Sequence, residues 1–208
     1  MADPLTPDAL LTTTRAVRRR LDLNRPVPRS LVEECLRVAQ QAPCGSGRNA
    51  LHWITVTDPG TRDRLGTIYR AAFEEQLAAA GGGADRQPPD GNRSLASAVH
   101  LAGNMGSVPV LVLACVVTPD PLPAGNQAGL WGSVMPGVWS YMLAARSRGL
   151  GTVWTTAHLR REAEVARLLG IPAGVHQVAL VPTAWYTGST FRPAARPPLS
   201  TVLHDERW

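Results

Sequence analysis

Apolar residues recur every three or four positions in several stretches of the chain, the spacing that gathers them on one face of a helix. Ser30 and Glu33 have the spacing of a capping box, so we expect the first of these helices to begin at Ser30. Asp58 precedes Pro59, a residue favoured at the first helical position, and this pair predicts the start of a long helix. The predicted helices are residues 30–41, 59–80, 133–148 and 159–169, with a weaker helical pattern over 94–106.

The predicted helix 133–148 contains a proline and many apolar residues. Pro136 falls in its first turn, where the missing N–H costs no hydrogen bond, and Gly149 suits the position after its end. Its apolar side chains are expected to face inward: Met135, Val138, Trp139, Met142 and Leu143.

Strands are predicted where β-branched and apolar residues follow one another without helical spacing. Residues 108–117 (VPVLVLACVV) are so uniformly apolar that we expect a strand buried on both faces. Further strands are predicted at 53–57, 152–156 and 177–186. Because helices and strands alternate without a strict strand–helix–strand rhythm, the pattern favours an α+β fold over a doubly wound parallel sheet.

Two segments lack either pattern. Residues 81–93 (GGGADRQPPDGNR) have the glycine, proline and aspartate content of a mobile surface loop. The tail 188–208 is rich in proline, ends in a tryptophan and is long enough to wrap around a partner subunit. With 208 residues and no linker that divides them, the chain is predicted to form a single domain over 1–208.

The composition narrows the class of protein. Hydrophobic residues make up 44% of the chain and charged residues 18%, which suits a folded domain. No stretch approaches the roughly 18 apolar residues of a membrane-spanning helix, and charged residues replace the apolar core of a signal peptide near the start. We therefore expect a soluble cytoplasmic protein without a membrane partner.

Cysteine and histidine spacing gives no support for a metal site. The three cysteines are widely spaced and form no C-x-x-C pair, and the five histidines are too far apart for two to share one helix face. Every basic residue is an arginine, which excludes Schiff-base catalysis by lysine and the lysine of a phosphate-binding P-loop. The net charge of +5 comes from scattered arginines with only 5% aromatic residues, so we expect no nucleic-acid partner.

One group of arginines is an exception to this scatter. Arg15, Arg18, Arg19 and Arg20 follow a run of threonines at 12–14, any of which is a candidate cap for a short helix. Guanidinium groups beside helix amides suit a phosphate. The alternative is a solvated basic face, which is the commoner role of a charge run.

Two glycine-containing motifs leave their meaning open. Residues 45–50 match G-x-G-x-x-A, but they follow a helix and precede a strand, the reverse of a dinucleotide-binding fingerprint. Residues 149–157 (GLGTVWTTA) combine glycines, hydroxyls and an indole, which suits the edge of a flat ring system and equally suits a helix end that leads into a core strand. No nucleophile elbow and no inward-facing pair of carboxylates is present.

Taken in order, five segments resemble the FMN-dependent nitroreductase family of flavin oxidoreductases. Each segment alone is unspecific, but all five occur in the family's order over nearly the whole chain. They are 15–22 (R-R-S-x-R-x-F-D in the family), 42–53 (A-P-S-x-x-N-x-Q-P-W-x-F), 136–139 with the G-L-G-T strand at 149–154, 169–172, and 196–199.

The resemblance implies an α+β fold with a central, mostly antiparallel sheet flanked by helices. It implies an intertwined homodimer with exchanged C-terminal arms and two FMN sites between the subunits. Arg15 and Arg19 would hold the phosphate or the pyrimidine end of the ring, with Arg18 as the alternative to Arg19, and Arg196 would reach the phosphate from the tail. The other implied contacts are backbone at Ala16 and Val17, Gly47 and Asn49 near the ribityl chain and ring, and Trp154, Thr155, Thr156 and Ala157 beside flavin N5.

Departures from the family pattern occur in two of these segments. Val17 stands where the family has serine, Gly47 and Asn49 replace an asparagine and a glutamine, and 50–51 replace a Pro-Trp pair. Two lost hydrogen bonds at about 0.5–1.5 kcal/mol each would weaken FMN binding roughly ten- to a hundredfold at most. We expect a specialised substrate or an altered redox potential.

The resemblance implies an enzyme without a catalytic acid or base of its own, because the flavin carries the chemistry. Two electrons would pass from NAD(P)H or an organic donor to a small aromatic or conjugated acceptor, with Tyr69, Phe73, Trp131 and Trp139 as candidate walls of the substrate space. Two alternatives stay open: a flavin-dependent dehydrogenase or desaturase of a biosynthetic pathway, and a flavin-binding protein without turnover.

Overall fold

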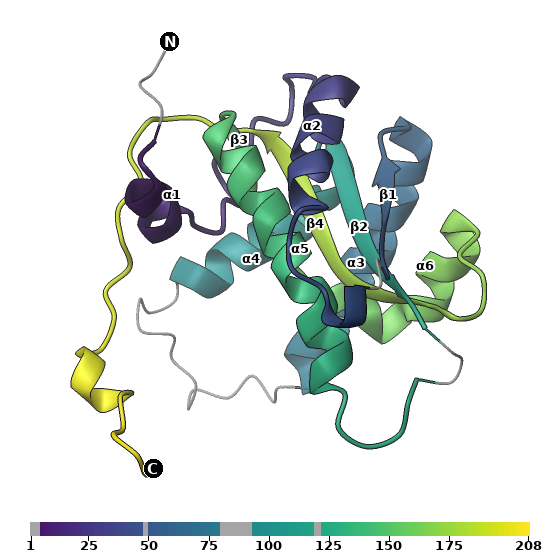
Figure 1. Ribbon diagram of the computed structural model, residues 1–208. Helices are drawn as coiled ribbons and strands as arrows, with labels where there is room; N and C mark the ends of the chain where they lie inside the picture. The colour runs from purple at the N-terminus through teal and green to yellow at the C-terminus, as the bar shows by residue number, and fades with distance from the viewer. Residues whose placement is uncertain (1–4, 48–49, 80–92, 119–121) are drawn as a thin grey trace.

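The computed structural model describes residues 5–47, 50–79, 93–118 and 122–208. Within these ranges it is an α+β structure in which helices cover both faces of one sheet (Figure 1). The helices are α1 (Pro7–Thr13), α2 (Arg29–Ala39), α3 (Pro59–Ala79), α4 (Arg93–Asn104), α5 (Ala128–Ser147) and α6 (Glu162–Leu169), with 3-10 turns at Gly45–Gly47, Met105–Ser107, Ala157–Arg161 and Leu199–Thr201. The strands are β1 (Leu51–Val56), β2 (Val110–Val117), β3 (Leu150–Thr152) and β4 (Val175–Trp185).

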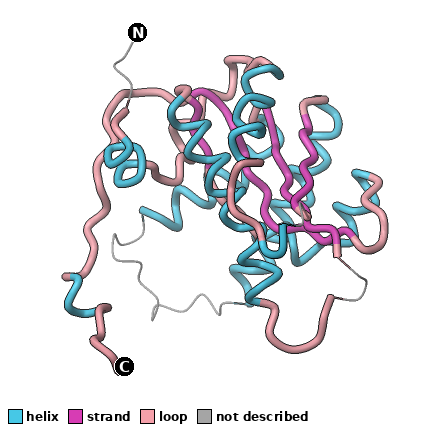
Figure 2. The backbone as a smooth tube through the Cα atoms, viewed as in Figure 1, coloured by secondary structure: helices cyan, strands magenta, loops and turns pink. Residues whose placement is uncertain are grey.

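The four strands form an antiparallel sheet in the order β1-β2-β4-β3 (Figure 2). β2 and β4 lie at its centre, and β2 is buried along its length except at its last residue, Val117. The prediction of a strand buried on both faces is therefore confirmed. The α+β class and the antiparallel sheet are confirmed as well.

Alternate residues of β2 enter two separate hydrophobic clusters. Leu111 and Leu113 pack with α3, α4 and α6, whereas Val110 and Val112 pack with α2 and α5. This alternation follows from the two-residue period of a strand, which sends neighbouring side chains to opposite faces of the sheet. The two layers of helices in Figure 1 are the cover of these two faces.

The ends of two helices test the capping predictions. The Asp58 carboxylate accepts a hydrogen bond of 2.7 Å from the Thr61 N–H and caps α3, as predicted. The capping box at Ser30 is wrong: α2 begins at Arg29 without a side-chain cap, and Glu33 forms an ion pair of 2.8 Å with Arg29. A solvent-exposed guanidinium one turn away takes the Glu33 carboxylate from the backbone.

The threonine-capped helix at the arginine group is also wrong. α1 ends at these threonines, with Thr13 as its last residue, and its N-terminus is capped by the Thr6 hydroxyl. The hydroxyls of Thr12, Thr13 and Thr14 donate to carbonyls four residues earlier and so complete this helix instead of starting another. The arginines that follow lie in an irregular segment.

The helix α5 begins five residues before the predicted start, so Pro136 lies inside it and not in its first turn. Two of the side chains expected to face inward are exposed: Met135 at 45% and Trp139 at 38%. Val138 and Met142 are buried as expected. The helical period gives the spacing of an apolar stripe but not its width, and α5 carries apolar residues on more of its surface than the sheet covers.

Other boundaries shift by a few residues. The predicted strand 152–156 is β3 at Leu150–Thr152, followed by an isolated bridge between Thr155 and Leu180. The predicted helix 159–169 divides into the 3-10 turn at Ala157–Arg161 and α6. The predicted loop 81–93 lies outside the described residues apart from Arg93, which begins α4.

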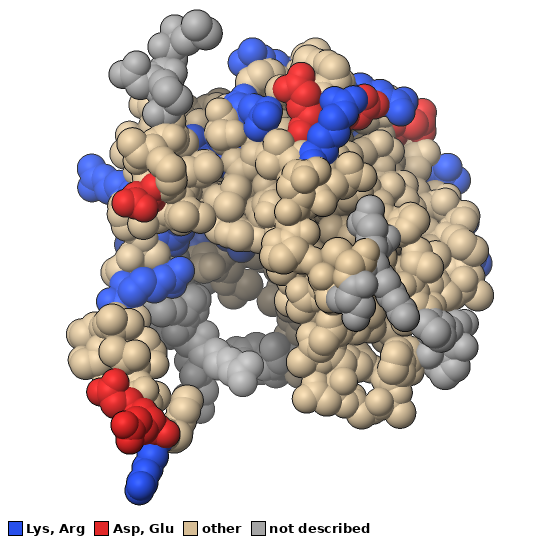
Figure 3. All heavy atoms as spheres, viewed as in Figure 1, with Lys and Arg blue, Asp and Glu red and all other residues tan. Residues whose placement is uncertain are grey.

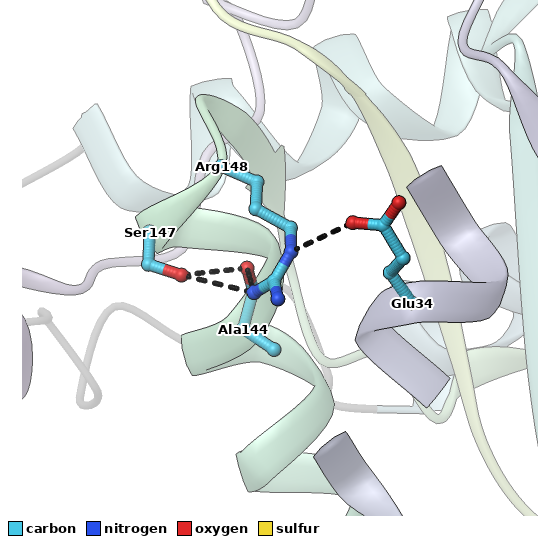
Figure 4. A network of polar contacts seen from close by, with 4 residues as sticks. All are labelled: Glu34, Ala144, Ser147 and Arg148. Atoms are coloured by element: carbon cyan, nitrogen blue, oxygen red, sulfur yellow. Dashed lines mark hydrogen bonds and ion pairs between the residues drawn. The ribbon is translucent and has the colours of Figure 1, made fainter. Parts of the chain in front are cut away.

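The end of α5 is tied to α2 by the network drawn in Figure 4. Arg148 donates to the Ala144 carbonyl at 3.1 Å and to the Ser147 hydroxyl at 3.3 Å, and its Nε lies 3.5 Å from a carboxylate oxygen of Glu34 on α2. The network holds the last turn of α5 just before the chain enters β3. At Gly149 the backbone takes a positive φ of 81°, which glycine adopts without strain, and this reverses the chain.

Candidate functional site

The arginine segment 15–20 is held against the sheet by the residues between its charged side chains. The Val17 N–H donates to the Thr152 carbonyl at 2.9 Å, and the Val17 side chain is buried against Gly151. Arg15 and Arg19 are exposed. Alternation of a buried valine with exposed arginines therefore directs the guanidinium groups outward from the edge of β3.

Two pockets meet at Arg15. The first, which we call the arm pocket, has a volume of about 350 Å³. It brings Arg15 together with Trp139 of α5 and with Arg196 of the C-terminal arm (residues 188–208). The predicted convergence of an N-terminal and a C-terminal arginine thus occurs within one chain.

The second pocket, which we call the arginine pocket, has a volume of about 250 Å³. Among the described residues no acidic residue lines it, whereas five arginines do: Arg15, Arg18, Arg19, Arg20 and Arg192. None of these five forms an ion pair with an acidic residue in the part of the chain that the structure describes. A pocket with this excess of positive charge favours an anion.

The two arginines that compete for one role in the sequence both reach this pocket. Arg18 lies 3.5 Å from the Ser97 hydroxyl, and Arg19 lies 3.4 Å from the Ala96 carbonyl. Both bonds are long and leave further N–H groups available. Figure 3 shows basic side chains on the part of the surface formed by α1 and the C-terminal arm.

The backbone expected at a phosphate is only partly available. The Val17 N–H is already paired with Thr152, while the N–H of exposed Ala16 has no partner among the described residues. This difference could not be predicted from the sequence, because the partner carbonyl lies in β3, far away along the chain.

Gly47 lies at a different place. It lines a third pocket of about 240 Å³ with Cys44, Trp53 and Ser133, and the Gly45 N–H donates to the Ser133 hydroxyl at 3.1 Å. This pocket shares no lining residue with the arm pocket or the arginine pocket, although α5 contributes Ser133 and Gly137 to it and Trp139 to the arm pocket. Asn49 lies outside the described residues.

The segment 154–157 follows β3 and is only partly accessible. Trp154 is half-buried and Thr156 is exposed, whereas the Thr155 hydroxyl is buried and donates to the Leu180 carbonyl at 2.6 Å. Ala157 belongs to the core. None of the four lines either pocket that contains Arg15. Hence only Trp154 and Thr156 offer side chains to a ligand in this chain.

The glycines before this segment have a packing role. A Cβ on Gly151 would lie 2.9 Å from Val17 Cγ1, closer than real Cβ contacts, so Gly151 makes room for the arginine segment. Gly149 supplies the positive φ after α5. Of the two roles considered for residues 149–157, the edge of a ring system or a helix end that leads into a core strand, these two glycines have the second.

Three residues with notable surroundings were not identified from the sequence: His158, Phe191 and Arg192. His158 is fully buried with no hydrogen-bond partner for either ring nitrogen among the described residues, and burial lowers its pKa to about 4. Phe191 and Arg192 line the arginine pocket, although the tail was singled out only for its length and for Arg196. The aromatic content of the arm was the available signal for Phe191.

Of the candidate wall residues, Trp139 lines the arm pocket and Trp131 is half-buried on α5. The prediction that Tyr69 and Phe73 form walls of the substrate space is wrong, because they form a stacked pair in the core with ring centroids 6.4 Å apart. The described residues contain no cluster of three or more histidine, cysteine, aspartate or glutamate side chains. No helix in these ranges is long and apolar enough to span a membrane.

The structure is thus an α+β domain with an antiparallel sheet, helices on both faces and an anion-favouring pocket at the sheet edge, and solved structures share this fold. Iodotyrosine deiodinase, solved in its oxidised form with FMN and 3-iodo-L-tyrosine, has 18% identity and a TM-score of 0.70 over 96% of this chain and 97% of that one. A nitroreductase-like protein from Bacillus cereus has 20% identity and a TM-score of 0.69 over 99% and 98%. Nitroreductase A from Vibrio parahaemolyticus has 16% identity and a TM-score of 0.68, covering 96% of this chain and 74% of that one.

At these identities the structures show a shared fold, and the sequence model of the nitroreductase family gives the assignment. It matches residues 11–185, from α1 to the end of β4. The chain therefore belongs to the nitroreductase family and is an oxidoreductase. No curated protein sequence matches it.

Proposed function

We propose that the protein is an FMN-dependent oxidoreductase that transfers two electrons between NAD(P)H or an organic donor and a small aromatic or conjugated acceptor. The observation that carries this proposal is the arm pocket, where Arg15 and Arg196 from nearly opposite ends of the chain face one space. The FMN-bound relative, whose other ligand is an aromatic amino acid, supports both the cofactor and the kind of acceptor.

The residues around the pockets fit a phosphorylated flavin. Arginine binds phosphate through paired, charge-assisted hydrogen bonds, and neither Arg15 nor Arg196 is paired with a described carboxylate. Arg15 and Arg196 would hold the phosphate, with Ala16 backbone beside them and Arg19 directed to the pyrimidine end. Trp154 and Thr156 are the accessible groups of the segment proposed to lie beside the ring.

We further propose that two copies of the chain build the site together. In one chain Gly47 lines a pocket that shares no residue with the arm pocket or the arginine pocket, and a two-fold dimer would supply a second copy of that loop. Trp139 and Met135 of α5 leave apolar surface uncovered beside the arm pocket. Large apolar side chains exposed together favour an interface between subunits.

The arm supports the same assembly. Its last residues extend away from the sheet (Figure 1), and several of their apolar side chains are exposed. Exchange of arms would cover them on the partner. In this proposal residues 1–208 form one nitroreductase-like domain, with 188–208 as the arm. The exposed apolar residues are Leu199, Val202, Leu203 and Trp208.

The contribution of the chain to the reaction is binding and exclusion of water. FMN, when bound, supplies an N5 that accepts and releases a hydride. The arginines orient the cofactor through its phosphate, and Trp139 with the partner's cover would keep water from the arm pocket. Neither Tyr69 nor Phe73 takes part, because both are buried in the core.

The test is the visible spectrum of the purified protein after reconstitution with FMN and removal of free cofactor. We expect bound-flavin bands that bleach when NADPH or NADH is added without oxygen and return in air. Oxygen uptake and reduction of a nitroaromatic compound, measured side by side, then separate a reductase from a dehydrogenase that is reoxidised by oxygen. A protein that retains no flavin under these conditions would refute the proposal.

A further inference from the structure

Arg20 holds the beginning of the C-terminal arm by its backbone. Its Nε donates to the Thr187 carbonyl at 2.7 Å, its Nη1 to the Thr190 carbonyl at 2.9 Å and its Nη2 to the Gly188 carbonyl at 3.1 Å. The Arg20 carbonyl also accepts from the Thr187 N–H at 2.9 Å. One side chain thus binds three backbone carbonyls between Thr187 and Thr190, just after β4 ends, and all three guanidinium nitrogens are engaged.

Phe191, the next residue of the arm, is held by two guanidinium groups. The Cζ of Arg20 lies 4.4 Å and the Cζ of Arg146 lies 3.8 Å from the centroid of its ring. Tyr186 meets the same ring edge-on with centroids 4.8 Å apart, and its hydroxyl accepts a hydrogen bond of 2.6 Å from Arg146. Cation–π contacts of this kind strengthen when they are desolvated, and Arg146 is only 8% exposed.

The residues that follow reach the pockets. Arg192 lines the arginine pocket, and Pro193 and Arg196 line the arm pocket. Phe191 is therefore the last anchored side chain before the arginines of the arm. Pro193, with its fixed φ, limits how far the chain can turn between this anchor and Arg196.

We propose that Arg20, acting with Phe191 and Arg146, is a positioning residue that makes the site selective for a phosphorylated flavin over riboflavin. This inference rests on the proposed function. Arg20 acts at a distance, because its nitrogens are occupied by the arm backbone; it places Arg192 and Arg196 where a phosphate binds. The isoalloxazine ring and ribityl chain, which riboflavin shares with FMN, gain nothing from this placement.

The experiment measures the dissociation constants of FMN and riboflavin with the dimeric apoprotein, by quenching of flavin fluorescence. The variants are Arg20→Lys, which keeps the charge and loses the planar set of donors, and Phe191→Leu, which changes no charge. Phe191→Tyr is the conservative rescue. Arg25→Lys is the matched control, because Arg25 also stacks on an aromatic ring, that of Trp185 at 3.9 Å, but binds no part of the arm.

For the unmodified protein we expect tighter binding of FMN than of riboflavin. Arg20→Lys and Phe191→Leu should each reduce this preference about tenfold, the size of one charge-assisted hydrogen bond, with riboflavin affinity within about twofold of the unmodified protein. Phe191→Tyr and Arg25→Lys should keep the preference. A melting curve shows whether Arg20→Lys folds. If it does not, the test is made with Phe191→Leu.

The outcomes separate this inference from the function on which it rests. Failure of the unmodified protein to bind either flavin overturns the proposed function. Equal loss of FMN and riboflavin affinity in the variants indicates a purely structural role and overturns the inference alone. A loss confined to Arg20→Lys, with Phe191→Leu unchanged, means that Arg20 touches the phosphate itself and also overturns it.

Discussion

Val17 lies so close to Gly151 that a Cβ on the glycine would stand 2.9 Å from Val17 Cγ1, while the Val17 N–H donates to the neighbouring Thr152 carbonyl at 2.9 Å. This contact joins the arginine segment to β3. The position of Arg15 and Arg19 relative to the sheet therefore depends on the absence of a side chain at residue 151.

Gly151→Ala is expected to destabilise the protein by about 1–3 kcal/mol, because the added methyl group meets Val17 and Leu21 in a packed region. Flavin retention should fall as well, since the arginine segment must move. Chemical unfolding measures the first effect. Gly103→Ala on α4, where nothing lies within 4 Å, is the control and should be neutral or stabilising. Equal stability of the two variants would remove the proposed role of Gly151.

Arg196→Ala should weaken FMN retention about ten- to a hundredfold, because one charge-assisted contact with the phosphate is lost. Arg160→Ala removes an exposed arginine that lines none of the pockets with Arg15, and should leave FMN retention unchanged. Equilibrium dialysis or fluorescence quenching compares the two. Equal effects would place the arm outside the site.

Acid should destabilise the protein through His158. Burial lowers its pKa to about 4, whereas the unfolded chain takes up this proton near pH 6.5. The unfolded state therefore binds more protons between these values, and stability present above pH 6.5 is lost as the pH falls towards 4. At pH 5 the loss from this residue is on the order of 2 kcal/mol.

Chemical unfolding of His158→Leu between pH 7 and pH 5 tests this. The variant should lose much less stability over that range than the unmodified protein. His100→Leu, which changes an exposed histidine of α4, should retain the full pH dependence. A His158→Leu profile parallel to that of the unmodified protein would mean that the imidazole is not held neutral by burial.

Trp139→Glu should convert the proposed dimer into a monomer, because a carboxylate would enter the apolar surface beside the arm pocket. Sedimentation measures the change in mass. Gln76→Glu adds the same charge on an exposed position of α3 and should leave the dimer intact. A monomeric unmodified protein, or a dimeric Trp139→Glu variant, would contradict the proposed interface.

Cys44 is expected to be the reactive thiol of the native protein. It is exposed beside Gly47, whereas burial raises the pKa of Cys35 to about 11 and that of Cys115 to about 12, so both remain protonated. FMN should protect Cys44 from alkylation if the Gly47 loop contacts the cofactor. Timed thiol titration with and without FMN measures this, and the Arg196→Ala variant, with weakened binding, should lose the protection.

Periodicity was a good guide to the elements and a poor one to their ends. The uniform apolar run of β2 has one stable placement, at the centre of a sheet covered on both sides, so the sequence predicted it correctly. Glu33 shows the limit: its spacing from Ser30 fits a capping box, but a competing arginine one turn away takes the carboxylate. Local spacing cannot rank two partners that are both within reach.

For the candidate site, the sequence predicted some of the residues but not which residues contact one another. Arg15 and Arg196 were both expected from the family resemblance, and the structure brings them to one pocket. The contact between Arg20 and Phe191 was not predicted. It joins the arginine segment to the residues just after β4, which are about 170 positions away along the chain, and local spacing carries no information on such a contact. Gly47 was expected near the ribityl chain and ring of the cofactor, and in one chain it lines a different pocket from the one that holds Arg15 and Arg196.

The sequence by itself determined the α+β class, the buried central strand and the family, because these depend on the order and spacing of residue types along the chain. Only the tertiary structure decided which guanidinium groups meet, which face of α5 remains uncovered and which amide of the arginine segment is already bonded. These depend on contacts between segments far apart in sequence, whose geometry is set by packing over the entire sheet.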